Sequence, residues 1–239
     1  MAGWCAAGML APMTRPPGAV RRPRAAAALA ACLALGLSGC AGVGQPQPYD
    51  SPGINGLVIP TPTPSHGDFV AGVDNPWLAL EPGATWRYDV SEDGRTLGTI
   101  DAEVLDATTE IAGLEATALR VTMDLDGPTA DETRFYAQDE DGNVWLVGVD
   151  SATGLSWRAG VDSAEAGLAM PADPRLGDGW VRFSVPNLLE ATTRVEDQSS
   201  TLVQTRDEAG TTTRKVYERG VGLASVEDLT AGWQAVLAR

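Results

Sequence analysis

The stretch Thr85-Trp86-Arg87-Tyr88-Asp89-Val90 alternates large apolar residues with polar ones. Successive side chains of an extended strand point to opposite faces. One face therefore carries Trp86, Tyr88 and Val90, and the other face is polar. The pattern predicts a strand that is buried on one side only.

The same alternation recurs along the chain. Residues 117–125 place Leu119, Val121 and Met123 on one face, and glycines such as Gly94 and Gly142 separate the alternating segments as turns would. We expect further strands at 96–106, 132–138, 143–149, 180–185, 191–196, 201–206, 212–219 and 223–227.

Helical periodicity is missing from residue 69 onward, where Leu188–Arg194 is the best weak candidate for a helix. A sheet with one apolar face needs a cover, and without an amphipathic helix it must cover itself. The sequence therefore predicts an all-β fold with few or no helices. We expect a single antiparallel domain over residues 69–239, either barrel-like or a two-layer sandwich.

The first 39 residues have the order of a signal peptide. Four arginines precede the apolar run Ala25–Leu37, which is shorter than the roughly 20 residues that a membrane-spanning helix needs. The run ends in Leu37-Ser38-Gly39-Cys40, which resembles the lipobox of bacterial lipoproteins. This resemblance implies that Cys40 receives a diacylglycerol and that the chain is cut just before it. The alternative is ordinary secretory cleavage near Ser38 or Gly39, which leaves Cys40 as a free thiol.

Removal of residues 1–39 would leave 13 basic against 32 acidic residues, a net charge of −19. Such a chain is a poor partner for nucleic acid, because phosphates repel it. Residues 40–68 then form a Pro-rich tether, extended at about 3.1 Å per residue. The short apolar patch Ile54–Ile59 could instead dock on the domain. We expect an extracytoplasmic protein whose membrane partner is lipid, held through Cys40.

Most catalytic chemistry lacks its residues in this chain. The only His is His66, in the tether, and the only Cys after residue 39 is Cys40. Nucleophile triads, His-based zinc sites and phosphate-binding loops therefore have no candidates. We expect no catalytic, cofactor-binding or metal-binding residue. A pair of carboxylates that hydrolyses a glycoside survives as an alternative, although no particular pair stands out among 32 acids.

The segment Asp139-Glu140-Asp141-Gly142-Asn143 offers two interpretations. Its acids have the spacing of a calcium loop, and Asp150 stands at the twelfth position. The sixth position is Val144, however, where such a loop needs Gly. A hairpin turn between two strands explains the same residues through Asp-Gly turn chemistry, and we favour that interpretation.

Two residue types outside these motifs have a structural and a functional interpretation. Six tryptophans follow residue 39, and filling of the core is favoured over stacking on sugars or lining an apolar pocket. They are Trp77, Trp86, Trp145, Trp157, Trp180 and Trp233. The single lysine, Lys215, is interpreted as a solvated strand residue.

Several short segments of the domain carry a further resemblance. They are Val73-Asp74-Asn75-Pro76-Trp77-Leu78, Leu80-Glu81-Pro82-Gly83-Ala84-Thr85-Trp86, Phe135-Tyr136-Ala137-Gln138 with Gly142-Asn143-Val144-Trp145, Met170-Pro171-Ala172-Asp173-Pro174 with Gly177-Asp178, and Tyr217 with Gly220-Val221-Gly222-Leu223. These segments are similar to recurring segments of an uncharacterised family of exported bacterial proteins. The resemblance spans about residues 69–230 and implies no activity.

These observations lead us to expect a membrane-tethered lipoprotein that acts as a non-enzymatic binding or accessory module of the cell envelope. Its partner would be an apolar small molecule inside a barrel, or another envelope protein. The alternatives are a carboxylate-dependent hydrolase of envelope polysaccharide and a purely structural envelope component.

Overall fold

The computed structural model describes residues 67–154, 156–188 and 190–239. Cys40, His66 and the expected signal peptide lie outside these residues, as does the expected tether up to residue 66. The described residues form strands and turns and contain no helix.

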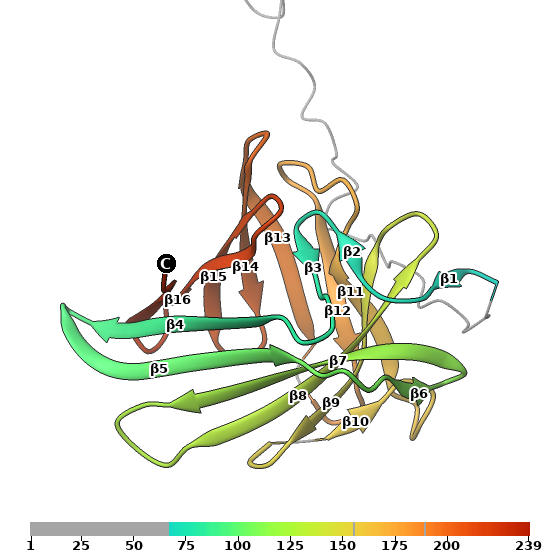
Figure 1. Ribbon diagram of the computed structural model, residues 1–239, viewed down its shortest axis with the longest axis horizontal. Coiled ribbons are helices and arrows are strands. Elements are labelled where there is room, and N and C mark those ends of the chain that lie inside the picture. The colour runs from blue at the N-terminus through green and yellow to red at the C-terminus, as the bar shows by residue number, and fades with distance from the viewer. Residues whose placement is uncertain (1–66, 155, 189) are drawn as a thin grey trace, which may run out of the picture. The chain divides into compact units, whose positions relative to one another are not determined.

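Twelve strands within the described residues close into one antiparallel barrel (Figure 1). In order around the barrel they are β4 (Thr85–Glu92), β5 (Arg95–Val104), β7 (Leu114–Asp124), β8 (Ala130–Asp139), β9 (Val144–Ser151), β11 (Glu165–Met170), β12 (Gly179–Ser184), β13 (Ala191–Gln198), β14 (Leu202–Glu208), β15 (Thr212–Glu218), β16 (Gly222–Asp228) and β17 (Trp233–Leu237). The pairing of β17 with β4 closes the ring. The all-β prediction is confirmed, and the sheet covers itself as a barrel, which leaves no open edge.

Five short strands lie outside the ring. β1 (Phe69–Val70) pairs with the end of β8, β6 (Thr109–Ile111) with β7, and β10 (Trp157–Arg158) with β9. β2 (Asp74–Asn75) and β3 (Leu78–Ala79) form a separate two-stranded hairpin.

The alternation in the sequence sets which side chains face the interior. On β4, Tyr88 and Val90 are buried and Trp86 is half-buried, whereas Thr85, Arg87 and Asp89 are exposed. The register continues this pattern across neighbouring strands, because Tyr88 lies opposite Ile100 of β5 and Ile100 lies opposite Met123 of β7. The predicted strand at 85–90 is therefore confirmed with its predicted buried face.

All eight of the further strands expected from the sequence coincide with strands of the barrel, whereas the weak helix candidate Leu188–Arg194 is wrong. From Ala191 onward that segment belongs to β13, and Ala191, Thr193 and Val195 are buried at alternate positions. Their spacing of two residues is that of a strand, which a seven-residue window with several polar residues did not reveal.

The antiparallel pairings gather the turns at two ends of the barrel. One end, which we call the capped end, carries the turns at 140–143, 171–178, 199–201 and 219–221. The opposite end, which we call the far end, carries the turns at 93–94, 125–129, 209–211 and 229–232.

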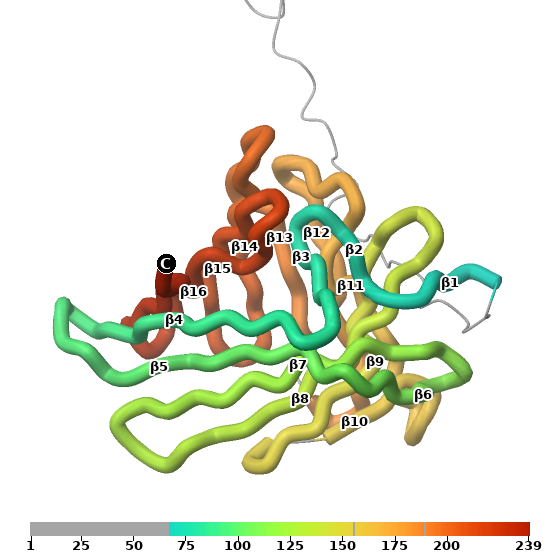
Figure 2. The backbone as a smooth tube through the Cα atoms, in the orientation of Figure 1, coloured from blue at the N-terminus to red at the C-terminus, as the bar shows by residue number. Residues whose placement is uncertain are grey.

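The β2–β3 hairpin is held against the capped end, where it lies beside β11 in Figure 2. The buried Asn75 side chain donates hydrogen bonds to the carbonyls of Gly142 (2.8 Å) and Pro171 (3.1 Å). The amide nitrogens of Asp74 and Asn75 both donate to Gln138 Oε1 at 2.9 Å. The Gly220 amide donates to the Pro76 carbonyl at 2.7 Å, so the hairpin reaches turns from both sides of the barrel.

These contacts also join several of the segments on which the expected resemblance to exported bacterial proteins rests. Asn75, Gln138, Pro171 and Gly220 all take part in them. The segments that carry the resemblance therefore meet at the capped end.

Candidate functional site: the barrel interior

Four charged side chains form a layer across the middle of the barrel. They are Arg134 from β8, Arg182 from β12, Asp207 from β14 and Lys215 from β15, and we call them the charged layer. All four line both of the cavities inside the barrel. Of these four residues, only Lys215 stood out in the sequence.

Asp207 is the acceptor at the centre of this layer. Its Oδ2 accepts hydrogen bonds from Lys215 Nζ at 2.6 Å and from Arg182 Nη1 at 3.1 Å. Its Oδ1 accepts one from the Thr193 hydroxyl at 2.8 Å. Burial alone would raise the pKa of this carboxyl group, but the adjacent charges of Lys215 and Arg182 outweigh burial and lower its pKa to about 2. Asp207 is therefore a stable anion inside the barrel.

Lys215 is not the solvated residue that the sequence suggested, and that interpretation is wrong. Its side chain is only 13% exposed, because residue 215 shares the inward face of β15 with Tyr217, while Arg214 points outward to Glu227. Burial is the largest influence on its pKa and lowers it, Asp207 opposes this, and the charges of Arg182 and Arg134 add to the lowering. The result is a pKa of about 8. Lys215 is thus close enough to Arg182 and Arg134 for their charges to disfavour its own.

Arg134 has a counter-charge of its own at the margin of the layer. Its Nε donates to Glu132 Oε1 at 2.5 Å, and both side chains are about one-third exposed. Among the described residues, Asp207 and Glu132 are the carboxylates paired with the three cations of the layer. The layer therefore carries one positive charge that these carboxylates do not neutralise.

The charged layer separates two cavities of different character. The smaller cavity, about 70 Å³, lies toward the capped end and is lined by Leu78 of β3 and by Leu80 just after that strand, with Trp86 and Tyr217. The larger cavity, about 300 Å³, lies toward the far end. Its apolar lining comes from Ile100, Val121, Met123, Val226, Trp233 and Ala235. The smaller space suits a few water molecules, and the larger is within the size range of small-molecule sites.

The larger cavity has an entrance at the far end. Ala209 and Thr211, in the β14–β15 turn, belong to its lining and are exposed. At the opposite end the β2–β3 hairpin covers the smaller cavity. A ligand therefore has a route from the far end to the charged layer.

The six tryptophans divide between core and cavity. Trp77, Trp145, Trp157 and Trp180 are at most 8% exposed and belong to the hydrophobic core, as predicted. Trp86 and Trp233 are half-buried and line the smaller and the larger cavity respectively. Two of the six tryptophans therefore line a pocket, which was the alternative to filling of the core.

The Asp139–Asn143 segment is a hairpin turn between β8 and β9, as favoured from the sequence. Asp139 Oδ1 accepts from the Asn143 amide at 2.8 Å, and Oδ2 accepts from the Trp145 indole at 2.8 Å. Gly142 has a φ of +86°, which suits glycine. Within the described residues, no group of three or more His, Cys, Asp or Glu side chains is placed to hold a metal ion.

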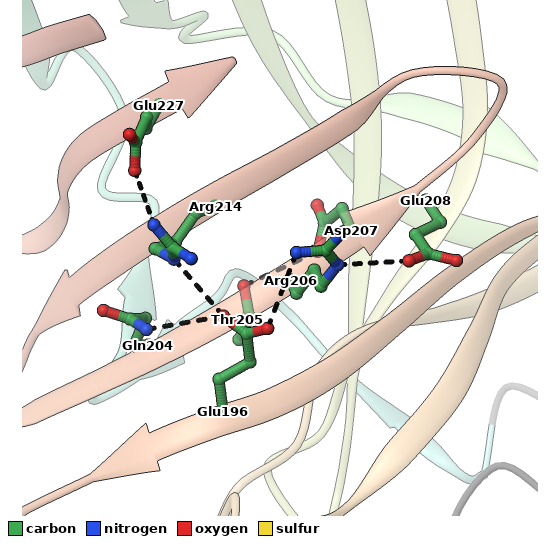
Figure 3. A network of polar contacts seen from close by, with 8 residues as sticks. All are labelled: Glu196, Gln204, Thr205, Arg206, Asp207, Glu208, Arg214 and Glu227. Carbon is green, nitrogen blue, oxygen red and sulfur yellow. Dashed lines mark hydrogen bonds and ion pairs between the residues drawn. The ribbon is translucent and has the colours of Figure 1, made fainter. Parts of the chain in front are cut away.

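The outward face of the same strands carries a different, solvent-facing network (Figure 3). Glu196 pairs with Arg206 at 3.9 Å and with Arg214 at 3.3 Å. Arg206 also pairs with Glu208, at 3.1 Å. A groove of about 790 Å³ lies over this face and is lined by Glu196, Arg206 and Glu208. Its acids are matched by guanidinium groups, so we place the candidate site inside the barrel.

Comparison with known protein families, with curated proteins and with solved structures finds no match to this chain. The resemblance to the exported-protein family therefore stays an expectation. Across the part of the chain that the structure describes, no helix is long and apolar enough to cross a membrane.

Proposed function

We propose that this protein is a membrane-tethered, extracytoplasmic lipoprotein whose barrel binds a small hydrophobic molecule without catalysing a reaction. The observation that carries the proposal is the apolar cavity of about 300 Å³ inside a closed barrel, reached from the far end and backed by the charged layer.

The strand number explains why such a space exists. An eight-stranded barrel is just wide enough for its own side chains to fill, and larger barrels enclose cavities unless something plugs them. Here the β2–β3 hairpin occupies the capped end only. Apolar walls that stay apart in a folded protein lose contacts that a ligand can restore.

The sequence before the barrel supports the anchoring part of the proposal. Leu37-Ser38-Gly39-Cys40 follows a basic and then an apolar segment, and prolines are frequent between residues 46 and 64. An acidic domain on an extended tether is repelled by anionic lipids and held away from the surface. The cavity would then be accessible to molecules in the extracytoplasmic space.

The two alternatives lack a comparable feature. A carboxylate-dependent hydrolase needs two acids free to face a substrate bond, and the acids of the outer groove, Glu196 and Glu208, both pair with Arg206. A purely structural role would leave the interior cavity without a use.

Native mass spectrometry of the full chain purified from its own host tests the binding function. We expect a population that carries a non-covalent small molecule, and this mass should disappear under denaturing conditions while the covalent lipid mass remains. A protein that shows only the bare lipidated mass under both conditions, and that binds no added hydrophobic dye, would contradict the proposal.

A further inference from the structure

If the barrel binds a ligand as proposed above, the head group of that ligand would contact the charged layer. We propose that the barrel takes a single-chain amphiphile with a monoanionic carboxylate head, such as a fatty acid, with the carboxylate at Arg134, Arg182 and Lys215 and the chain in the apolar cavity toward the far end.

The basic side chains of the charged layer outnumber the acidic ones. Three basic side chains line the cavities against one acid, Asp207, and Glu132 at the margin pairs with Arg134. A cation left without a counter-charge in a partly dry interior is costly. One bound carboxylate supplies the missing charge, whereas a neutral ligand leaves it unmet.

The two arginines of the layer have hydrogen-bond donors to spare. Arg182 contacts Asp207 through Nη1, and Arg134 contacts Glu132 through Nε. A guanidinium group has five N–H donors in a planar fork, so each arginine keeps further donors for a second acceptor. Carboxylates are the acceptors that match this fork best.

The polar and apolar parts of the lining of the larger cavity lie at opposite ends. The charged layer forms the inner wall of the larger cavity, and from there toward the entrance the lining is largely apolar, including Val121, Met123 and Trp233. A ligand with one charged end and one long apolar chain fits only with the charged end innermost. The small cavity beyond the layer has room for water around the head group.

Isothermal titration calorimetry on the full chain tests this assignment, with laurate, dodecanol and dodecyl phosphate as probes below their micelle concentrations. We expect laurate to bind about tenfold or more tightly than dodecanol, because the charge-assisted hydrogen bonds belong to the carboxylate alone. We expect dodecyl phosphate to bind more weakly than laurate, because its second charge exceeds the surplus of the layer.

Two variants locate the head group. Arg134→Met should weaken laurate binding about tenfold or more and leave dodecanol binding within about twofold. Lys215→Met should behave in the same way. Arg214→Met is the matched control, since Arg214 neighbours Lys215 on β15 but points outward, and it should bind laurate like the unaltered protein.

Three results would overturn the assignment. Equal affinity for laurate and dodecanol, unchanged by Arg134→Met, would show that the layer does not select an anion, while leaving the cavity as the binding site. Tighter binding of dodecyl phosphate than of laurate would show that the head group is not a monoanion. Failure of all three probes to bind would contradict the proposed function itself.

Discussion

At the residue scale, Asp207 holds the charged layer together, because Lys215 and Arg182 both donate to its Oδ2. We expect Asp207→Asn to lower the free energy of unfolding by about 3–5 kcal/mol, since it leaves buried cations without their acceptor. Lys215→Met should cost much less, because Asp207 keeps Arg182 and a buried charge is removed. Urea denaturation of both variants measures the difference. Equal costs would show that the layer is not organised around Asp207.

The pKa of Asp207 predicts a pH dependence of stability. Its pKa is about 2 in the folded protein against an ordinary value of 3.8, so the unfolded chain binds the proton more readily. The stability that this group contributes is present above about pH 4 and is lost as the pH falls toward 2. Asp207→Asn should remove this part of the acid sensitivity. The measurement compares urea midpoints of both proteins between pH 5 and pH 2, and parallel curves would contradict the prediction.

The charged layer could not be predicted from the sequence, for a physical reason. Thr213, Arg214 and Val216 lie around Lys215 and place polar residues on both faces of β15. The alternation of side chains therefore does not show which face points inward. Only the register with Thr205 of β14 and Val226 of β16 settles that. The available signal was weak: Arg134 lies opposite Leu119 of β7 and shares its face of β8 with Tyr136, but Glu132 and Gln138 lie on that face too.

At the element scale, a calcium site and an ordinary hairpin at the β8–β9 turn lead to different predictions. Both carboxylate oxygens of Asp139 already accept hydrogen bonds from this hairpin. Calcium should therefore raise the melting temperature no more than magnesium does at equal ionic strength. A calcium-specific rise that Asp141→Asn abolishes would contradict the hairpin interpretation.

The same turn predicts which substitution is damaging. Gly142 has a φ of +86°, and a Cβ there would lie 3.3 Å from the Cβ of Ala172. Gly142→Val should destabilise the protein by about 1–3 kcal/mol, because a β-branched residue resists this backbone conformation. Thermal denaturation measures it, with Glu140→Val in the same turn as the control that should change little.

Elements with a clear alternation were predictable, and the others were not. β4 and the second half of β7 carry large apolar residues at alternate positions, and both strands were expected. β11 was missed because Glu165-Ala166-Gly167-Leu168-Ala169-Met170 is rich in small residues of low strand propensity. Its glycine is required by packing, since a Cβ at Gly167 would lie 2.3 Å from the backbone carbon of Arg182. β17 has only five residues, and its role depends on pairing with β4, far away in the sequence.

At the scale of the whole molecule, the proposed lipid anchor at Cys40 predicts in which cell fraction the protein is found. Cys40→Ala should abolish lipid labelling in the native host and move the protein from the membrane fraction to the soluble fraction, because buried acyl chains contribute about 0.8 kcal/mol per CH₂. Fractionation and metabolic labelling with a fatty acid measure this. Membrane retention of the Ala variant, with no label in the unaltered protein, would contradict the lipoprotein proposal.

The apolar cavity inside the barrel is the proposed ligand site, and a pair of substitutions on β7 tests this proposal most directly. Val121 lines the larger cavity, whereas its neighbour Thr122 faces outward, where its hydroxyl donates to Asp131. Titration with the neutral dye Nile red should show saturable binding to the unaltered protein and to Thr122→Trp. Val121→Trp should weaken binding about tenfold or more, because the indole occupies the space. Val121→Phe, a smaller intrusion, should weaken it less, and circular dichroism confirms that each variant is folded. Equal dye affinity of folded Val121→Trp and Thr122→Trp would contradict the claim.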